Sequence, residues 1–146
     1  MEPIYVDIHI HTSDNPDKLN TNYDVKTLFF KVNEIGNNAR CLISLTDHNT
    51  INKDAYVKAL AAIPENMKML LGVELHIKNY EKAPAYHCHI FFKDPVSEQV
   101  IDKLNVILDD LYPNKQVEKN DNNLPTLDKI IKHFDADTTE AFYKYR

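Results

Sequence analysis

Short apolar segments alternate with helical patterns through the first two thirds of the chain. Residues 4–10 (IYVDIHI) alternate with a period of two, which predicts a β-strand. The apolar runs 41–45 (CLISL), 68–77 (KMLLGVELHI) and 85–92 (AYHCHIFF) predict three further strands. In the first strand the pattern places four apolar side chains on one face, namely Ile4, Val6, Ile8 and Ile10.

Helical periodicity fills the segments between and after these strands. Residues 24–36 repeat an apolar stripe, with Asp24 placed to cap the start and Gly36 to end the helix. A second helix is predicted over 53–63, ahead of Pro64, and a third opens at Asp94-Pro95. The third carries the longest stripe, Val96, Val100, Ile101, Leu104, Ile107, Leu108 and Leu111, and a short helix is predicted over 126–134.

This order of elements predicts an α/β fold with parallel strands, because parallel neighbours need a crossover helix between them. Only two glycines are present, and no GxGxxG or Walker motif occurs, which excludes the usual dinucleotide and P-loop sites. We therefore expect part of a barrel, with function at the C-terminal ends of its strands. Residues 1–112 would carry the motifs of one domain, and 113–146 a polar linker and a helical segment of the same domain.

Composition limits the classes of function. The 146 residues are 43% hydrophobic and 27% charged, as in one globular domain, and no apolar run is long enough for a membrane span. The N-terminus lacks a signal-peptide pattern and no CxxC pair occurs, so we expect a cytoplasmic protein that does not contact membranes. The net charge of −5 argues against a strong nucleic-acid interface in this chain alone.

Imidazoles and carboxylates gather where the predicted strands end. His9 and His11 share the parity of Asp7 in the first strand, and TDHN (46–49) follows the second. The third and fourth strands add the pairs Glu74 with His76 and His87 with His89, each pair of one parity. Buried groups of this kind need partners, and together they are the ligand set of Zn²⁺, Mn²⁺ or Fe²⁺.

Four motifs carry a family resemblance over residues 4–92. The motifs, in chain order, are DIHIHT, SLTDHNT, GVELH and YHCHIFF. They resemble the first motifs of the PHP (polymerase and histidinol phosphatase) domain family. The resemblance implies a distorted (β/α)7 TIM-like barrel, a site for two or three divalent metal ions and phosphoester hydrolysis by metal-bound hydroxide. An amidohydrolase also opens with HxH, but the TDH and GVE motifs favour PHP.

Carried over residue by residue, the resemblance assigns metal ligands and catalytic residues. The ligands are His9, His11, His48, Glu74 as a bridging carboxylate, and His87, with His89 as the alternative to His87. A loop ligand is expected at Asp17 or Asp14, of which Asp17 is preferred. Asp7 and Asp47 are expected to orient imidazoles, and His76 to lie on the substrate side. Glu74, His48 and Asp47 would be the catalytic residues.

The chain also departs from the family pattern. The later His and the final Asp-x-His pair are absent, since His133 is followed by Phe and residues 135–137 read DAD. This favours an incomplete barrel from a larger protein, whose whole length could add a nucleic acid partner. The alternative is a non-catalytic metal-binding or regulatory module of such a protein, for example an ATPase fusion. The terminal aromatics Phe142, Tyr143 and Tyr145 would pack within the chain or at a homodimer contact.

Overall fold

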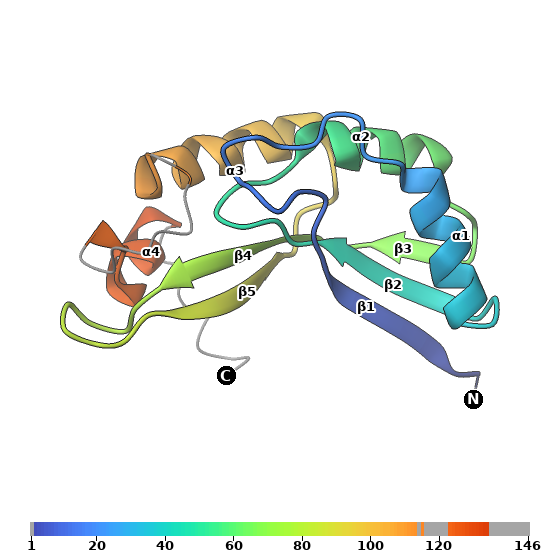
Figure 1. The fold of residues 1–146 in the computed structure, drawn as a ribbon, viewed down its shortest axis with the longest axis horizontal. Helices are drawn as coiled ribbons and strands as arrows, with labels where there is room; N and C mark the ends of the chain where they lie inside the picture. The colour runs from blue at the N-terminus through green and yellow to red at the C-terminus, as the bar shows by residue number, and fades with distance from the viewer. Residues whose placement is uncertain (1, 114, 116–122, 135–146) are drawn as a thin grey trace.

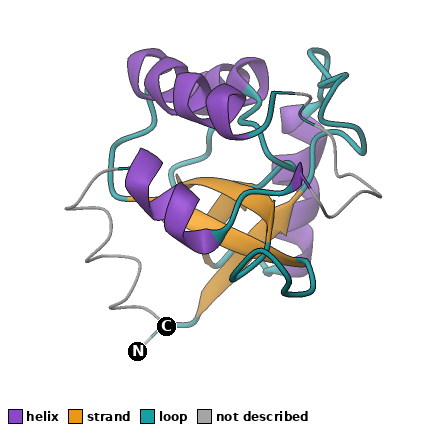
Figure 2. Ribbon diagram, turned by 90° about the vertical axis from the view of Figure 1, so that its left-hand side faces the viewer, coloured by secondary structure: helices purple, strands orange, loops and turns teal. Residues whose placement is uncertain are grey.

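The fold is a bent layer of strands with its longer helices on one side (Figures 1 and 2). It is known from a computed structural model, which describes residues 2–113, 115 and 123–134. The predicted packing of Phe142, Tyr143 and Tyr145 and the motif at 135–137 lie outside the described residues. The elements in chain order are β1 (Ile4–Ile10), α1 (Val25–Ile35), β2 (Arg40–Leu45), α2 (Lys53–Ala62), β3 (Met67–Met69), β4 (Leu71–Ile77), β5 (Tyr86–Phe92), α3 (Glu98–Leu111) and α4 (Leu127–His133).

The first three strands form a parallel sheet in the order β1-β2-β3. The helices α1 and α2 make the crossovers, so the predicted mixed α/β class with parallel strands is confirmed for this part. The single strand predicted over 68–77 is wrong. It divides at Leu70, whose backbone N–H donates to Ile43 O at 2.9 Å, into β3 beside β2 and β4 beside β5.

The fourth predicted strand runs in the opposite direction to the one expected. β5 pairs antiparallel with β4, in a register that sets Glu74 opposite His89 and His76 opposite His87. A short loop after Ile77 joins them, and antiparallel neighbours need no crossover helix. The imidazoles of β5 therefore come from the start and middle of the strand and not from its C-terminal end.

Two backbone hydrogen bonds join the sheets at the point where the polar residues gather. Glu74 N–H donates to Asp47 O at 3.0 Å, and Asn49 N–H donates to Glu74 O at 2.9 Å. The described residues thus form one strand layer, and this layer does not close into a barrel. The central strand β4 is buried along its whole length.

A β-bulge in β1 changes which side chains share a face. Asp7 pairs with Ile43 and Ile10 with Leu45, so two residues, Ile8 and His9, stand opposite Ser44 alone. A bulge of this kind reverses the alternation beyond it. The predicted face of Ile4, Val6, Ile8 and Ile10 is therefore wrong: Ile4 and Val6 are 57% and 52% exposed, whereas Ile10 packs against both hydrophobic clusters.

Polar side chains cap the helices. Asp24 accepts from Thr27 N–H at the start of α1, as predicted, and Asn52 caps α2. The third helix begins at Glu98 and not at Pro95, because the Ser97 side chain accepts from Val100 N–H and fixes the start there. None of the described helices is both long and apolar enough to cross a membrane.

The larger core cluster holds the central hairpin against the helices. Every second residue of β4 is apolar and packs with the buried faces of α3 and α4; these residues are Leu71, Val73, Leu75 and Ile77. The opposite parity of β4 carries Gly72, Glu74 and His76. Since alternate residues of a strand face opposite sides, packing of the apolar set fixes the direction of Glu74.

Candidate metal centre

Glu74 stands at the centre of a cluster of imidazoles. It is 3% exposed, in the middle of β4. The histidines that surround it come from β1 and the residue directly after it, from β5, and from the segment after β2. Four ring nitrogens lie near the Oε2 atom of Glu74: His9 Nε2 at 3.1 Å, His11 Nε2 at 2.5 Å, His48 Nδ1 at 3.9 Å and His89 Nε2 at 3.4 Å. A fifth, His87 Nδ1, lies 2.8 Å from Oε1.

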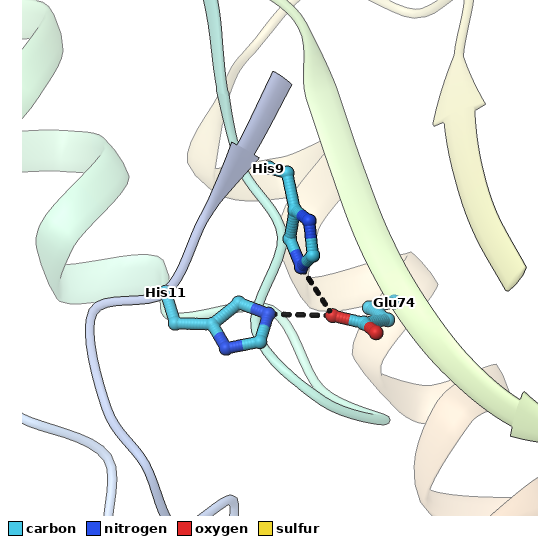
Figure 3. Close-up of side chains that lie close together, drawn as sticks. All are labelled: His9, His11 and Glu74. Carbon is cyan, nitrogen blue, oxygen red and sulfur yellow. Dashed lines mark hydrogen bonds and ion pairs between the residues drawn. The ribbon is translucent and has the colours of Figure 1, made fainter. Parts of the chain in front are cut away.

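Two sets of ligand atoms share this carboxylate. One group consists of His9, His11 and Glu74, and the other of His48, Glu74 and His87. Within each group the candidate ligand atoms lie within 4.8 Å of one another. Figure 3 shows the imidazoles of His9, on β1, and of His11, directly after it, pointing toward the same oxygen of Glu74. The cluster could therefore hold a metal ion.

A buried ring nitrogen without a hydrogen bond gives a further reason to expect a divalent ion here. His48 Nδ1 is buried and makes no hydrogen bond in the described part of the chain, although it lies 3.9 Å from Glu74 Oε2. A buried nitrogen that faces a carboxylate across this distance is too far for a hydrogen bond but suitably placed for a shared cation. Imidazole and carboxylate are also ordinary ligands of Zn²⁺ and related ions.

Backbone conformation places His48 beside Glu74. The segment after β2 pairs with β4 through an isolated parallel bridge between His48 and Glu74. Asn49 follows with a φ of 58°, in the left-handed region that asparagine tolerates better than most residues, and its side chain accepts from His76 N–H at 2.9 Å. The sequence TDHN thus contributes a candidate ligand from His48 and a turn from Asn49.

The two aspartates expected to orient imidazoles make other contacts. Asp47 accepts from Thr12 N–H (2.8 Å), Thr12 Oγ1–H (2.8 Å) and Ser13 N–H (3.0 Å). Asp7 accepts from the backbone N–H of His9 at 3.4 Å. These contacts within the described residues are to backbone N–H groups and a hydroxyl, and none is to a ring nitrogen. Asp47 instead fixes the chain directly after His11, and it is a positioning residue.

Sequence reasoning missed the polar residues that complete this support. Asn52 is 1% exposed; it caps α2 through Oδ1 and donates from Nδ2 to Thr12 Oγ1 at 2.7 Å. Thr12 then donates from Oγ1 to Asp47. The threonine after HIH was the available signal, since a small hydroxyl next to a ligand can both donate and accept.

The other candidates lie around this cluster or away from it. Asp14 and Asp17 are exposed in the loop after β1 and belong to neither group. His76 is 9% exposed, and its ring meets that of His87 edge-on with a centroid distance of 4.8 Å. His133 is remote, since it bonds Asp110 on α3 at 2.7 Å and Lys129 O at 2.8 Å.

The charges of the cluster suit metal binding near neutral pH. Burial works to raise the pKa of Glu74, but the hydrogen bond from His11 and the charges of His48, His11 and His89 outweigh it and lower this pKa to about 2. Burial lowers the pKa of His48 to about 4. A carboxylate that is ionised and an imidazole that is neutral are the states in which these groups bind metal. Burial also raises the pKa of Asp47, against the hydrogen bonds from Thr12 and Ser13.

The lowered pKa of His48 predicts a pH-dependent stability of the metal-free protein. Unfolded chains bind a proton at His48 near pH 6.5 and the folded chain near pH 4, so the unfolded state binds more protons between these values. The free energy of unfolding should therefore fall as the pH drops from 6.5 to 4, by up to about 3 kcal/mol from this residue.

Urea unfolding at several pH values in the presence of a chelator measures this slope. The His48→Gln variant should show a flatter slope than the wild type. Equal slopes in wild type and His48→Gln would contradict the assignment.

Comparison of the chain with protein-family models, with curated proteins and with solved structures finds no match. The case for a function consequently depends on the motifs and on the geometry of the cluster.

Proposed function

We propose that this chain is a metal-dependent phosphoric ester hydrolase of the PHP type. The observation that carries the proposal is the single buried carboxylate of Glu74, shared between two groups of ligand atoms. Shared carboxylates suit paired metal ions about 3.5–4 Å apart, an arrangement that many phosphatases and nucleases use. The four motifs in their order support the same class.

The accessibility of the ligands favours catalysis over a structural metal site. The side chains of His9 and His87 are 57% and 42% exposed, while Glu74 is buried beneath them. Each group supplies three protein ligands, and catalytic zinc sites have three protein ligands with one position open. A structural site would have four ligands closed off from water.

The residues of the cluster would divide the work as follows. The metal ions, Zn²⁺, Mn²⁺ or Fe²⁺, would be held by His9, His11, His48, His87 and Glu74. When bound, such ions supply Lewis acidity toward phosphate oxygens and acidify water. Asp47 keeps the chain after His11 in place, and Asn49 keeps the turn after His48. Exposed His9 and His87 mark the side from which a phosphate ester would approach.

Metal content and hydrolysis measured on the same samples test the proposal. We expect about two ions per chain, and hydrolysis of bis-p-nitrophenyl phosphate or p-nitrophenyl phosphate that depends on added Zn²⁺ or Mn²⁺. The double variant His9→Ala/His11→Ala should lose both metal and activity, whereas His133→Ala should keep both. Bound metal without turnover would favour the alternative, a non-catalytic metal-binding module of a larger protein, and absence of metal would contradict both.

A further inference from the structure

We propose that His89 is a third imidazole ligand in the group of His9, His11 and Glu74, which would make this half of the centre a nitrogen-rich site with three imidazoles and one carboxylate. The inference rests on the proposed metal binding and extends it, since it assigns a ligand and a preference among metals. His89 lies outside the two three-residue groups, and four observations place it with the first of them.

The first observation is the strand register. Antiparallel pairing sets His89 of β5 directly opposite Glu74 of β4. Directly opposed residues point to the same face of a sheet, with Cβ atoms about 4.5–5.5 Å apart. The backbone of the hairpin therefore delivers His89 to the carboxylate, and no loop conformation is involved.

The second observation is the atom that His89 approaches. Its Nε2 lies 3.4 Å from Oε2 of Glu74, the same oxygen that the Nε2 atoms of His9 and His11 approach at 3.1 and 2.5 Å. Three imidazoles, two from β1 and the residue that follows it and one from β5, thus direct the same ring nitrogen toward one oxygen.

The third observation is a hydrogen bond that is not made. His89 Nε2 is buried and has no hydrogen-bond partner among the described residues, whereas His9 and His11 both have contacts of hydrogen-bond geometry with Oε2. One carboxylate oxygen has two lone-pair directions, so two N–H donors fill it and a third imidazole gains no bond there. A cation among these nitrogens and Oε2 would give each nitrogen lone pair a partner.

The fourth observation is the packing of His89 on the most exposed imidazole of the cluster. The rings of His89 and His9 meet edge-on at a centroid distance of 4.2 Å. His9 lies on β1, an outer strand of its sheet, and its side chain is 57% exposed. A ligand from β5 beside it would tie the outer strand to the hairpin through the same ion.

The ligand set has a consequence for the choice of metal. Imidazole suits Zn²⁺, Cu²⁺ and Ni²⁺, whereas sites rich in carboxylate oxygen suit Mg²⁺ and Mn²⁺. Three imidazoles with a single shared carboxylate therefore predict that Zn²⁺ binds more tightly than Mn²⁺ at this half of the centre. With four protein ligands this half of the centre would resemble a closed zinc site, so the open position for substrate falls on the other half, where His48, Glu74 and His87 supply three ligands.

Calorimetric titration of chelator-treated protein with Zn²⁺ and with Mn²⁺ tests the ligand role. The His89→Ala variant should weaken the tighter Zn²⁺ site by at least about 10- to 100-fold, which is the loss caused by removing a residue that merely orients a ligand. His89→Gln keeps an amide donor toward Glu74 but is a poor zinc ligand, so it should lose as much affinity as His89→Ala. The matched control His133→Gln should bind as the wild type does.

A spectroscopic measurement separates ligation from orientation of Glu74. Co²⁺ substituted into the wild type and into His89→Ala should give visible absorption bands of different energy and intensity, and added free imidazole should restore the wild-type bands. Unchanged bands, or wild-type Zn²⁺ affinity in His89→Gln, would overturn the ligand role of His89 and leave the proposed function standing. Absence of metal binding by the wild type would overturn both.

Discussion

Replacement of Glu74 by glutamine is expected to abolish binding of both metal ions, because one carboxylate serves both groups of ligands. Glutamine keeps the shape of the side chain and removes its charge. The imidazoles around it would then face a neutral amide, and neither group of ligands would keep a carboxylate to offset the charge of a divalent ion. Metal content should fall from about two ions per chain to none, and metal-dependent hydrolysis should fall with it.

The same change on the surface is the control. Glu34 lies exposed on α1, and Glu34→Gln should leave metal content and unfolding unchanged. Circular dichroism of Glu74→Gln checks that the variant is folded. Retention of one ion per chain by folded Glu74→Gln would contradict a shared carboxylate and indicate two independent sites.

Replacement of Tyr56 by phenylalanine is expected to cause a large loss of stability, although it removes only one atom. The buried hydroxyl donates to Leu45 O at 2.8 Å and accepts from the N–H groups of Leu45 and Gly72, both at 3.1 Å. Removing it leaves two buried backbone donors without an acceptor, each at about 1–3 kcal/mol, so we expect a loss of roughly 2 to 4 kcal/mol. Urea denaturation of metal-free protein measures it.

This change should also weaken metal binding, since the hydroxyl joins β2 to β4. Leu45 directly precedes the segment that carries His48, and Gly72 lies two residues before Glu74. Tyr80 offers the matched control: it is 65% exposed, and Tyr80→Phe should alter neither stability nor metal affinity. A Tyr56→Phe protein as stable as the wild type would show that solvent or a shifted side chain replaces the hydroxyl.

The hydrophobic pattern predicted most elements because their signals are local. Alternation in residues 4–10 and the stripes of α1 and α3 depend on nearest neighbours in the chain, and Asp24 caps the helix that follows it. The gathering of these side chains in one cluster was also predicted, from their places in or directly after the apolar strands and from the order of the four motifs. The residues are His9, His11, His48, Glu74 and His87.

The features that sequence could not predict depend on pairing between strands. Period-two alternation is the same in parallel and antiparallel strands, so the strand pattern itself does not reveal the reversal of β5. The available signal was the segment between Ile77 and Tyr86, which is too short for a crossover helix. The bulge at Ile8 and His9 exists only relative to β2. The role of His89 depends on its register with Glu74, which is likewise a property of the hairpin.

The distance along the chain between the imidazoles and the carboxylate has a consequence for protein synthesis. His9 and His11 contact Glu74 across separations of 65 and 63 residues, and His87 and His89 follow later still. Contacts between distant segments form late, because the intervening chain must first be ordered. A nascent chain that ends before β5 therefore offers metal only part of the ligand set, and we expect tight loading to begin once the ribosome has released the β4-β5 hairpin.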